Sequence, residues 1–360
     1  DKEGESSMKK SMRAVTLVTP GHLECLTTDV PTLQNPNDVL IKVHACGVCG
    51  SDIARVMVKG AHKMPITIGH EFAGEVVEVG SAVKSPRISD RVTIMPLVPC
   101  GQCNFCRIGE YTLCDDYLYY GSRIPGAMAE YILVNERNVL KLPENVDYEM
   151  GAITDPVSVA LHAVRKVQVE PGQSAAVFGM GAIGLISVQW LKNLGCTKVV
   201  AVDIFDEKLE LAKTLGADYI INGKKTDAVK AILDYTQGKG VDIAIELAGS
   251  KFTQPQAILS VGKMGKVVYC GISYDDLLLP HQALNAILRG ELTLIGSWNS
   301  SIAPLPINEW ESALKFMNIG KIQVKPLISH RVRLEDCQAV FEMMHHKTEV
   351  FTKVMFEPEL

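Results

Sequence analysis

Three glycines at fixed spacing constrain the fold of this 360-residue chain more than any other feature. They lie in the run Gly179-Met-Gly-Ala-Ile-Gly184, between the β-like stretch 174–178 and the helix-like stretch 183–191. A strand that turns sharply into a helix needs a glycine for the tight turn, and another where the helix packs closely on the strand. The spacing therefore predicts a strand–turn–helix unit of an α/β fold.

The region around this motif alternates between strand-like and helix-like segments from Val157 to about Ser300. The β-runs 198–203 and 241–249 are apolar on both faces, and helical segments separate them from their neighbours. Strands of this kind form a parallel sheet that is covered by helices. We expect a doubly wound parallel-sheet domain over residues 158–298.

An acidic residue follows the glycine motif at an informative distance. Asp203 ends the next β-run, nineteen residues after Gly184. A carboxylate at this position accepts the ribose hydroxyls of a dinucleotide and repels a 2′-phosphate, and residues 204–206 contain no arginine. The sequence predicts NAD(H) rather than NADP(H), with a purely structural glycine turn as the weaker alternative. The pyrophosphate would lie at the helix N-terminus, against Gly179, Gly181, Ala182, Ile183 and Gly184.

The remainder of the chain has a different pattern. Up to about Pro156, short β-runs are separated by Gly, Pro, Asp and Asn, which predicts a compact, mostly antiparallel β domain. After Trp298 no further glycine motif occurs, so we expect the C-terminal segment to return to this first domain. The expected domains are 1–157 with 299–360, and 158–298. Residues before Met8 are expected to be a disordered extension.

Composition excludes several classes of function. The chain has 36 basic and 41 acidic residues, a net charge of −5 and no long basic run, which argues against nucleic acid or an anionic membrane as a partner. No apolar stretch approaches the length of about 18 residues that a membrane helix needs, and the N-terminal segment lacks a hydrophobic signal core. We expect a cytoplasmic protein whose ten cysteines are thiols rather than disulfides.

Four of these cysteines lie within fifteen residues of one another. Thiolates spaced C-x2-C-x2-C-x7-C can surround a tetrahedral cation and leave no open position, so they predict a structural zinc site. An iron–sulfur cluster also uses four thiolates, but the long last gap and the absence of a following proline disfavour it. Four free thiols in a loop would be open to oxidation without structural gain. The cysteines are Cys100, Cys103, Cys106 and Cys114.

A second set of metal-binding side chains precedes the four cysteines. Cys49 lies in Gly-Val-Cys-Gly-Ser-Asp, and His70 and Glu71 lie in Gly-His-Glu. A thiolate, an imidazole and one oxygen ligand would leave a coordination position for substrate or water, as a catalytic zinc site requires. Cys46 forms a C-x2-C pair with Cys49, but its place on a β-like run favours a buried apolar role.

These motifs occur in the order and spacing of a known family. Over residues 12–358, the chain resembles the zinc-dependent medium-chain alcohol and polyol dehydrogenases. The resemblance implies a discontinuous, mostly-β GroES-like catalytic domain, a Rossmann domain, NAD, one catalytic and one structural zinc per subunit, and a homodimer or homotetramer. It also implies a fourth catalytic ligand from a Glu-Pro pair, which is Asp155-Pro156 here. Because aspartate is shorter, direct ligation, action through water and lining of the site remain open for Asp155.

Several shorter runs are similar to galactitol-1-phosphate 5-dehydrogenases within this family, namely 50–55, 60–62, 65–72, 121–123, 295–298 and 309–310. This narrower resemblance implies oxidation of galactitol 1-phosphate to tagatose 6-phosphate. Sorbitol or xylitol, arabitol-phosphate and L-threonine 3-dehydrogenases share most of the scaffold and remain alternatives. A non-catalytic regulatory protein or zinc scaffold is disfavoured, because it would leave the ligand set or the glycine motif unexplained.

Two further roles follow from the expected chemistry. Ser51, adjacent to Cys49, is the expected first member of a proton relay. A phosphorylated polyol needs cations at one end of the cleft, for which solvated surface charges are the alternative interpretation. The candidate substrate residues are Arg55, Lys59, His62, Lys63, Arg123 and Trp298.

Overall fold

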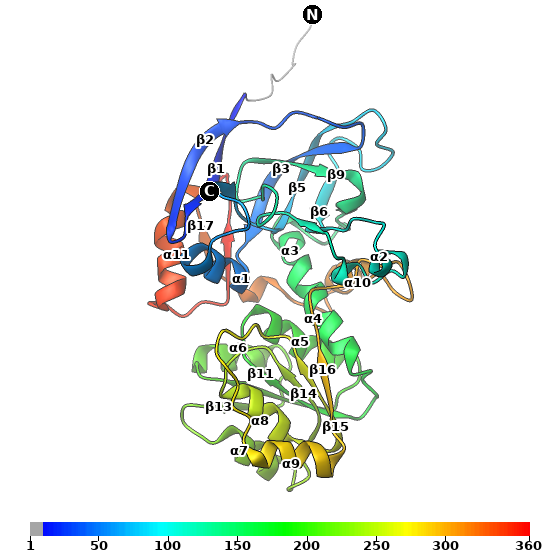
Figure 1. Cartoon of the computed structure of the whole chain (residues 1–360), viewed down its shortest axis with the longest axis vertical. Coiled ribbons are helices and arrows are strands. Elements are labelled where there is room, and N and C mark those ends of the chain that lie inside the picture. Colours follow the sequence, from blue (N-terminus) through cyan, green and yellow to red (C-terminus); the bar gives the residue numbers. More distant parts are fainter. Residues whose placement is uncertain (1–9) are drawn as a thin grey trace, which may run out of the picture. The chain divides into compact units, whose positions relative to one another are not determined.

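The computed structural model describes residues 10–360, which form two compact units (Figure 1). The first unit contains the residues up to Arg107 together with Cys114–Ile153 and His330–Leu360. The second contains Ile108–Leu113 and Thr154–Ser329. The domain boundaries given above stay a prediction, and the extension expected before Met8 lies outside the described residues.

The first unit is built on antiparallel sheets. A three-stranded sheet has the order β2-β1-β4, and a seven-stranded sheet has the order β10-β6-β5-β3-β18-β17, with β9 paired to β3. The strands are β1 (Ser11–Thr19), β2 (His22–Asp29), β3 (Asp38–Gly47), β4 (Ile66–Thr67), β5 (Glu71–Val79), β6 (Arg91–Ile94), β9 (Tyr131–Asn135), β10 (Val139–Lys141), β17 (Ile328–Val332) and β18 (Lys353–Phe356). A separate hairpin joins β7 (Leu97–Val98) to β8 (Leu118–Tyr119).

Strand β3 is central to this unit and is buried along most of its length. β18, from the end of the chain, pairs with it antiparallel, with Met355 opposite Gly47. Figure 1 shows this red C-terminal part among the blue N-terminal strands. The helices of the unit are α1 (Gly50–Ala54), the π-helix η1 (Arg55–Lys59), α2 (Asn104–Arg107), η3 (Glu136–Asn138), α3 (Tyr148–Ala152), η5 (Leu334–Asp336) and α11 (Cys337–His346).

The second unit contains a six-stranded parallel sheet of order β13-β12-β11-β14-β15-β16. This is the strand order of a doubly wound dinucleotide-binding fold, so the expected fold class is confirmed. The strands are β11 (Ser174–Phe178), β12 (Lys198–Asp203), β13 (Tyr219–Asn222), β14 (Val241–Glu246), β15 (Val261–Tyr269) and β16 (Thr293–Gly296). The helices are η2 (Tyr111–Leu113), α4 (Thr154–Lys166), α5 (Ala182–Asn193), α6 (Asp206–Thr214), α7 (Ala228–Tyr235), α8 (Thr253–Ser260), α9 (His281–Gly290), α10 (Glu309–Asn318) and η4 (Lys325–Leu327).

The sequence pattern missed the last helix and strand of this sheet, α9 and β16. The apolar residues Leu284, Leu288 and Leu294 of these elements are exposed rather than buried. β16 is only four residues long and has one neighbour, β15, so it carries little of the apolar pattern that marks the inner strands.

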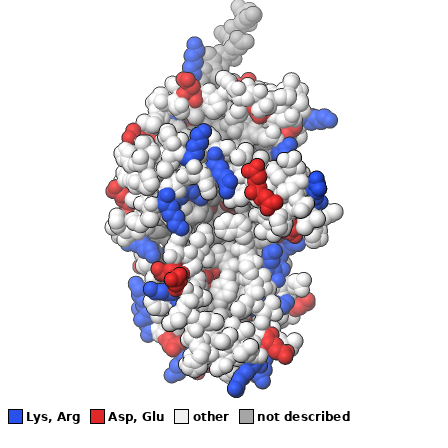
Figure 2. Space-filling model, viewed as in Figure 1, with Lys and Arg blue, Asp and Glu red and all other residues white. Residues whose placement is uncertain are grey.

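The surface agrees with the balanced composition. On the face shown in Figure 2, basic and acidic side chains are interspersed and most of the surface is uncharged. None of the helices formed by residues 10–360 has the length and apolar character needed to cross a membrane.

A turn after β8 packs on the backbone that precedes His70. The amides of Arg123 and Ile124 both donate to the carbonyl of Tyr119, at 3.0 and 3.2 Å. Gly121, with φ of 77°, lies so close to Gly69 that a Cβ on it would be 2.7 Å from the Gly69 nitrogen and oxygen. The turn and the segment leading to His70 are therefore joined through their backbones.

We expect Gly121→Ala to lower the thermal unfolding midpoint of the first unit strongly. The substitution combines left-handed strain of about 1–2 kcal/mol with overpacking of about 1–3 kcal/mol. Gly21→Ala is the matched control, because Gly21 has φ of 81° in the same unit but only one atom, at 3.8 Å, near its would-be Cβ. Scanning calorimetry should show the larger shift for Gly121→Ala; equal shifts would contradict the importance of this backbone contact.

Candidate active site

The structure brings Cys49, His70 and Glu71 together in the first unit. Cys49 precedes α1, His70 precedes β5, and Glu71 is the first residue of β5. Pairing of β3 with β5 places Gly47 opposite Glu71, which draws the two segments together. One potential ligand atom from each of the three residues lies within 4.8 Å of the others. The cluster offers sulfur, nitrogen and oxygen donors at a spacing that suits one metal ion.

Asp52 lies behind this cluster and was not singled out from the sequence. It is fully buried on α1, and its Oδ1 is 3.3 Å from Nδ1 of His70. Arg55 donates to the same oxygen at 2.5 Å, and the Cys49 amide donates to Oδ2 at 3.2 Å. Burial opposes ionisation of Asp52, yet the adjacent His70 and Arg55 lower the pKa of its carboxyl to about 2. A carboxylate in this position orients the imidazole of a metal-binding histidine.

Glu71 is held by a lysine from the other end of the chain. Lys353 donates to Glu71 Oε2 at 2.5 Å and to the Val48 carbonyl at 2.9 Å. Glu71 and Lys353 are each only 2% exposed, so the lysine offsets a charge that burial alone would penalise. Gly47 leaves the necessary space, because a Cβ there would lie 2.6 Å from Glu71 Oε2. No local sequence signal reveals Lys353, which is 282 residues from Glu71.

The other residues expected in the catalytic set have different positions. Ser51 lies beside the cluster, and its hydroxyl donates to Cys49 Sγ at 3.3 Å. Cys46 is buried on β3, as expected for an apolar role. Asp155 is buried in the first turn of α4 in the second unit, so its part in metal binding stays a prediction. Trp298, 51% exposed after β16, also belongs to the second unit.

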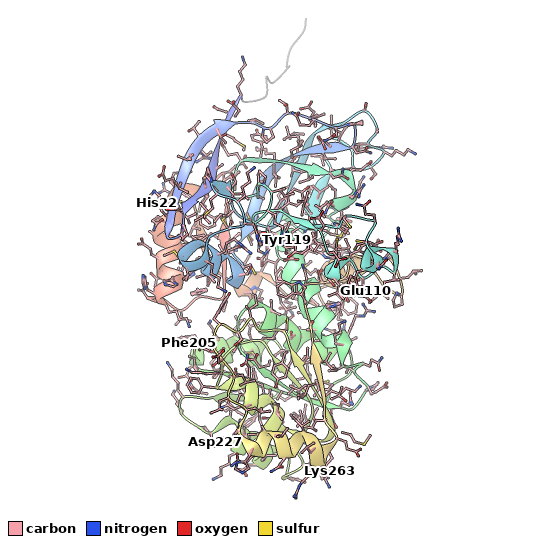
Figure 3. All side chains as sticks on the ribbon, in the orientation of Figure 1. His22, Glu110, Tyr119, Phe205, Asp227 and Lys263 are labelled. Atoms are coloured by element: carbon pink, nitrogen blue, oxygen red, sulfur yellow. The ribbon has the colours of Figure 1, made fainter. Side chains whose placement is uncertain are left out.

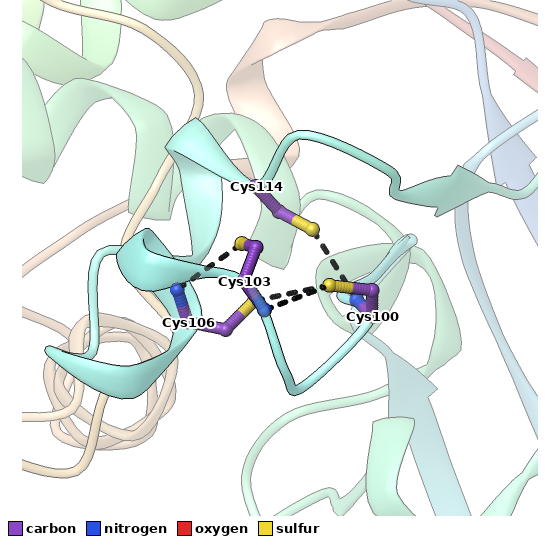
Figure 4. A group of neighbouring side chains, drawn as sticks. All are labelled: Cys100, Cys103, Cys106 and Cys114. Atoms are coloured by element: carbon purple, nitrogen blue, oxygen red, sulfur yellow. Dashed lines mark hydrogen bonds between the residues drawn. The ribbon is translucent and has the colours of Figure 1, made fainter.

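The four cysteines of the loop around α2 form a second cluster (Figure 4). Their sulfur atoms lie within 4.8 Å of one another. Backbone amides donate to three of them: Cys100 N to Cys114 Sγ at 3.3 Å, Cys103 N to Cys100 Sγ at 3.4 Å, and Cys106 N to Cys103 Sγ at 3.5 Å. Hydrogen bonds from the amides of Asp115 and Cys106 lower the pKa of Cys103 to about 6. Four converging sulfurs, three of which accept these backbone hydrogen bonds, suit a closed tetrahedral zinc site.

The glycine motif has the geometry of a phosphate-binding turn. Gly179 follows β11 with φ of 96°, and a Cβ on Gly184 would lie 1.8 Å from the Gly179 carbonyl oxygen. Gly181 precedes α5 and would have no atom within 4 Å of a Cβ, so open space lies beside the helix N-terminus. An anionic group can approach the backbone of Gly181, Ala182 and Ile183 from that space.

Asp203 lies at the C-terminal end of β12, next to this turn. Its carboxylate accepts hydrogen bonds from the amides of Met180 at 2.6 Å, Ile204 at 2.7 Å and Phe205 at 3.0 Å. Phe205, labelled in Figure 3, has the Nζ atoms of Lys208 and Lys224 at 5.2 and 5.4 Å from its ring centroid. These two lysines were not predicted from the sequence, where the choice of cofactor rested on Asp203 and on the absence of arginine in residues 204–206.

The candidate substrate cations differ in their surroundings. Arg55 is engaged by Asp52, whereas Lys59, His62 and Lys63 are exposed on the segment from η1 to β4. The Arg123 guanidinium lies 4.3 Å from the centre of the Tyr117 ring. The structure thus places these cations in three different environments, and their role in substrate binding stays a prediction.

Comparison with protein families gives two matches in different parts of the chain. Residues 35–144 match the model of the alcohol dehydrogenase GroES-like domain, and residues 182–318 match that of the zinc-binding dehydrogenase. Galactitol 1-phosphate 5-dehydrogenase of Escherichia coli (strain K12) is 36% identical over 91% of this chain and 95% of its own length. Sorbitol dehydrogenase of Bacillus subtilis (strain 168) is 32% identical over 98% of this chain and 99% of its own length.

Solved structures agree with these matches. The galactitol-1-phosphate dehydrogenase structure from Escherichia coli has a TM-score of 0.91 and 34% identity, covering 96% of this chain and 100% of that one. A zinc-binding dehydrogenase structure from Sinorhizobium meliloti 1021, bound to NADP, has a TM-score of 0.90 and 30% identity, covering 97% and 100%. The chain therefore belongs to the zinc-dependent medium-chain alcohol and polyol dehydrogenase family of oxidoreductases.

Proposed function

We propose that the protein oxidises a secondary alcohol of a polyol or polyol phosphate to the ketose, with hydride transfer to NAD. The observation that carries this proposal is the cluster of Cys49, His70 and Glu71 in a chain that also has the glycine turn and Asp203. Galactitol 1-phosphate, which would give tagatose 6-phosphate, is the proposed substrate because a galactitol 1-phosphate 5-dehydrogenase is 36% identical to this chain.

Two zinc ions per chain fit the side chains that are present. Cys49, His70 and Glu71 would hold the catalytic ion, and the four cysteines around α2 would hold the structural one. A bound catalytic zinc would supply a Lewis acid that lowers the pKa of the substrate alcohol. The buried Asp52 and Lys353 support this interpretation, because each fixes one of the ligand side chains.

The protein's own residues would orient the reactants and move the proton. Ser51 is placed for proton transfer, because its hydroxyl lies beside Cys49 and is partly exposed. The glycine turn and the N-terminus of α5 would bind the pyrophosphate, and Asp203 the adenosine ribose. These contacts would hold the nicotinamide where it can accept a hydride.

The choice of NAD rests on Asp203. A carboxylate at the end of β12 disfavours a 2′-phosphate. Lys208 and Lys224, near Phe205, are features that would suit NADP, the cofactor bound in the Sinorhizobium meliloti relative. We propose NAD because three backbone amides hold the Asp203 carboxylate at the strand end. The side chains of Lys208 and Lys224 are long and flexible, so they can turn away from the cofactor.

A panel of polyols tests the function directly. The assay follows the ultraviolet absorbance of the reduced nicotinamide. With NAD as cofactor, we expect the kcat/KM for galactitol 1-phosphate to be at least ~10-fold above that for galactitol, sorbitol, xylitol, arabitol phosphate or threonine. NADP should be the poorer cofactor. A better rate with sorbitol or threonine would replace the proposed substrate, and no reduction with any member would contradict the proposed reaction.

Metal analysis tests the two zinc sites separately. We expect about two zinc ions per chain in the purified protein and about one in either Cys103→Ser or Cys49→Ser, because each variant removes a thiolate from one cluster only. Cys196→Ser is the control, since Cys196 is a buried cysteine outside both clusters and should leave the content unchanged. Unaltered zinc in Cys103→Ser would contradict the structural site.

Replacing Ser51 tests the proton path. Loss of a group that transfers a proton lowers kcat by about 10²–10⁴-fold. We expect Ser51→Ala to show a fall of this order and a changed pH profile, with zinc content retained. Ser85→Ala, an exposed serine of the same unit, should behave as the unaltered protein. A normal rate and pH profile in Ser51→Ala would rule out this role.

A further inference from the structure

Arg123 differs from the other partly buried arginines of residues 10–360. Arg13, Arg55 and Arg165 each pair with a carboxylate, and Arg91 donates to three backbone carbonyls. Arg123 pairs with no acid in the described part of the chain, and its buried Nε has no hydrogen-bond acceptor there. A partly buried guanidinium that lacks an acceptor costs stability unless an acceptor comes from outside the protein.

Aromatic rings connect Arg123 to the metal-binding cluster. The guanidinium lies over the Tyr117 ring at 4.3 Å, and the Tyr117 and Tyr119 ring centres are 6.4 Å apart. Tyr119, labelled in Figure 3, meets the His70 ring edge to face at 5.3 Å. A continuous series of side-chain contacts therefore runs from Arg123 through the two tyrosines to His70, a proposed zinc ligand.

The backbone also fixes this cation relative to the cluster. The Arg123 amide donates to the Tyr119 carbonyl at 3.0 Å, and Gly121 packs on Gly69, the residue before His70. Tyr117 then limits where the long side chain can go, because a guanidinium stacks on an aromatic face. A cation held in this way loses little freedom when an anion binds.

The exposed candidates lack this arrangement. Lys59, His62 and Lys63 are on the surface, where water screens their charge, and Arg55 is already neutralised by Asp52. Arg123 alone among the five candidate cations combines partial burial, an aromatic support and no acidic partner in the described chain. Its planar donors also match the oxygens of a phosphate monoester.

We propose that Arg123, supported by Tyr117, binds the phosphate of the substrate and makes the enzyme selective for phosphorylated polyols. This inference rests on the proposed function and names the residue that recognises the anionic end of its substrate. Phosphate oxygens could also come from the dinucleotide, so the test must separate these two sources.

The first measurement is the ratio of kcat/KM for galactitol 1-phosphate to that for galactitol. Arg123→Gln should lower this ratio roughly 10- to 100-fold. The main effect should be a higher KM for the phosphorylated substrate, because the lost contact to phosphate is made in the bound substrate as well as in the transition state. Arg123→Lys should give a smaller fall, because it keeps the charge but not the planar donors. Arg289→Gln, an exposed arginine at the end of α9, is the control and should leave the ratio unchanged.

The second measurement does not require turnover. Isothermal titration of inorganic phosphate into protein saturated with NAD, which occupies the dinucleotide phosphate site, should show binding that Arg123→Gln weakens at least ~10-fold. The KM for NAD should stay the same in this variant. If Arg123→Gln loses phosphate binding but the unaltered protein oxidises no polyol, Arg123 is still an anion site. Only the proposed reaction is then rejected. An unchanged ratio with unchanged phosphate binding, or a raised KM for NAD alone, would overturn the inference.

Discussion

The ion pair between Glu71 and Lys353 is the interaction on which the candidate metal-binding cluster of Cys49, His70 and Glu71 depends. A carboxylate buried this deeply needs a compensating charge, and Lys353 supplies it from the last strand of the chain. The pair exists only because β3 has β5 on one side and β18 on the other, with a glycine at position 47 to leave room. The burial of Glu71 and the make-up of the cluster therefore both depend on the pairing of β3 with β5 and β18.

In the second unit, the candidate binding site is formed mainly by backbone groups rather than by side chains. The sheet order reverses beside β11, and the glycine turn opens at that strand end toward the N-terminus of α5. Gly184 brings the helix against the turn, and Gly181 keeps the approach clear. Asp203 accepts a hydrogen bond from the Met180 amide, so one carboxylate stabilises the turn that we propose as the dinucleotide site. One chain thus contains a side-chain cluster that suits a metal ion and a backbone turn that suits an anionic group.

Local sequence patterns predicted the fold class and the two clusters of candidate metal ligands. The glycine run and the cysteine spacing are short-range signals, and both lead to the elements that the structure contains. Contacts that depend on the folded chain were missed: Lys353 reaches Glu71, 282 residues away, through strand pairing, and Tyr117 meets Arg123 through a folded turn. Asp52 was visible in a quoted motif, but nothing in the linear order shows that it lies behind His70. β16 was missed because a short edge strand with exposed side chains lacks the apolar run of its neighbours.

The position of Lys353 on β18 also determines when the first unit can be completed during synthesis. Strands β3 and β5 emerge early, but the charge that balances Glu71 emerges only after the whole parallel sheet of the second unit has been made. Until then Glu71 lacks its buried partner. β9 covers residues 38–42 of β3, but Cys46 and Gly47 lack the strand that pairs with them, and such an open strand end is prone to wrong pairing. The first unit of the nascent chain thus stays incomplete until the residues of β18 complete the sheet and supply the partner of Glu71.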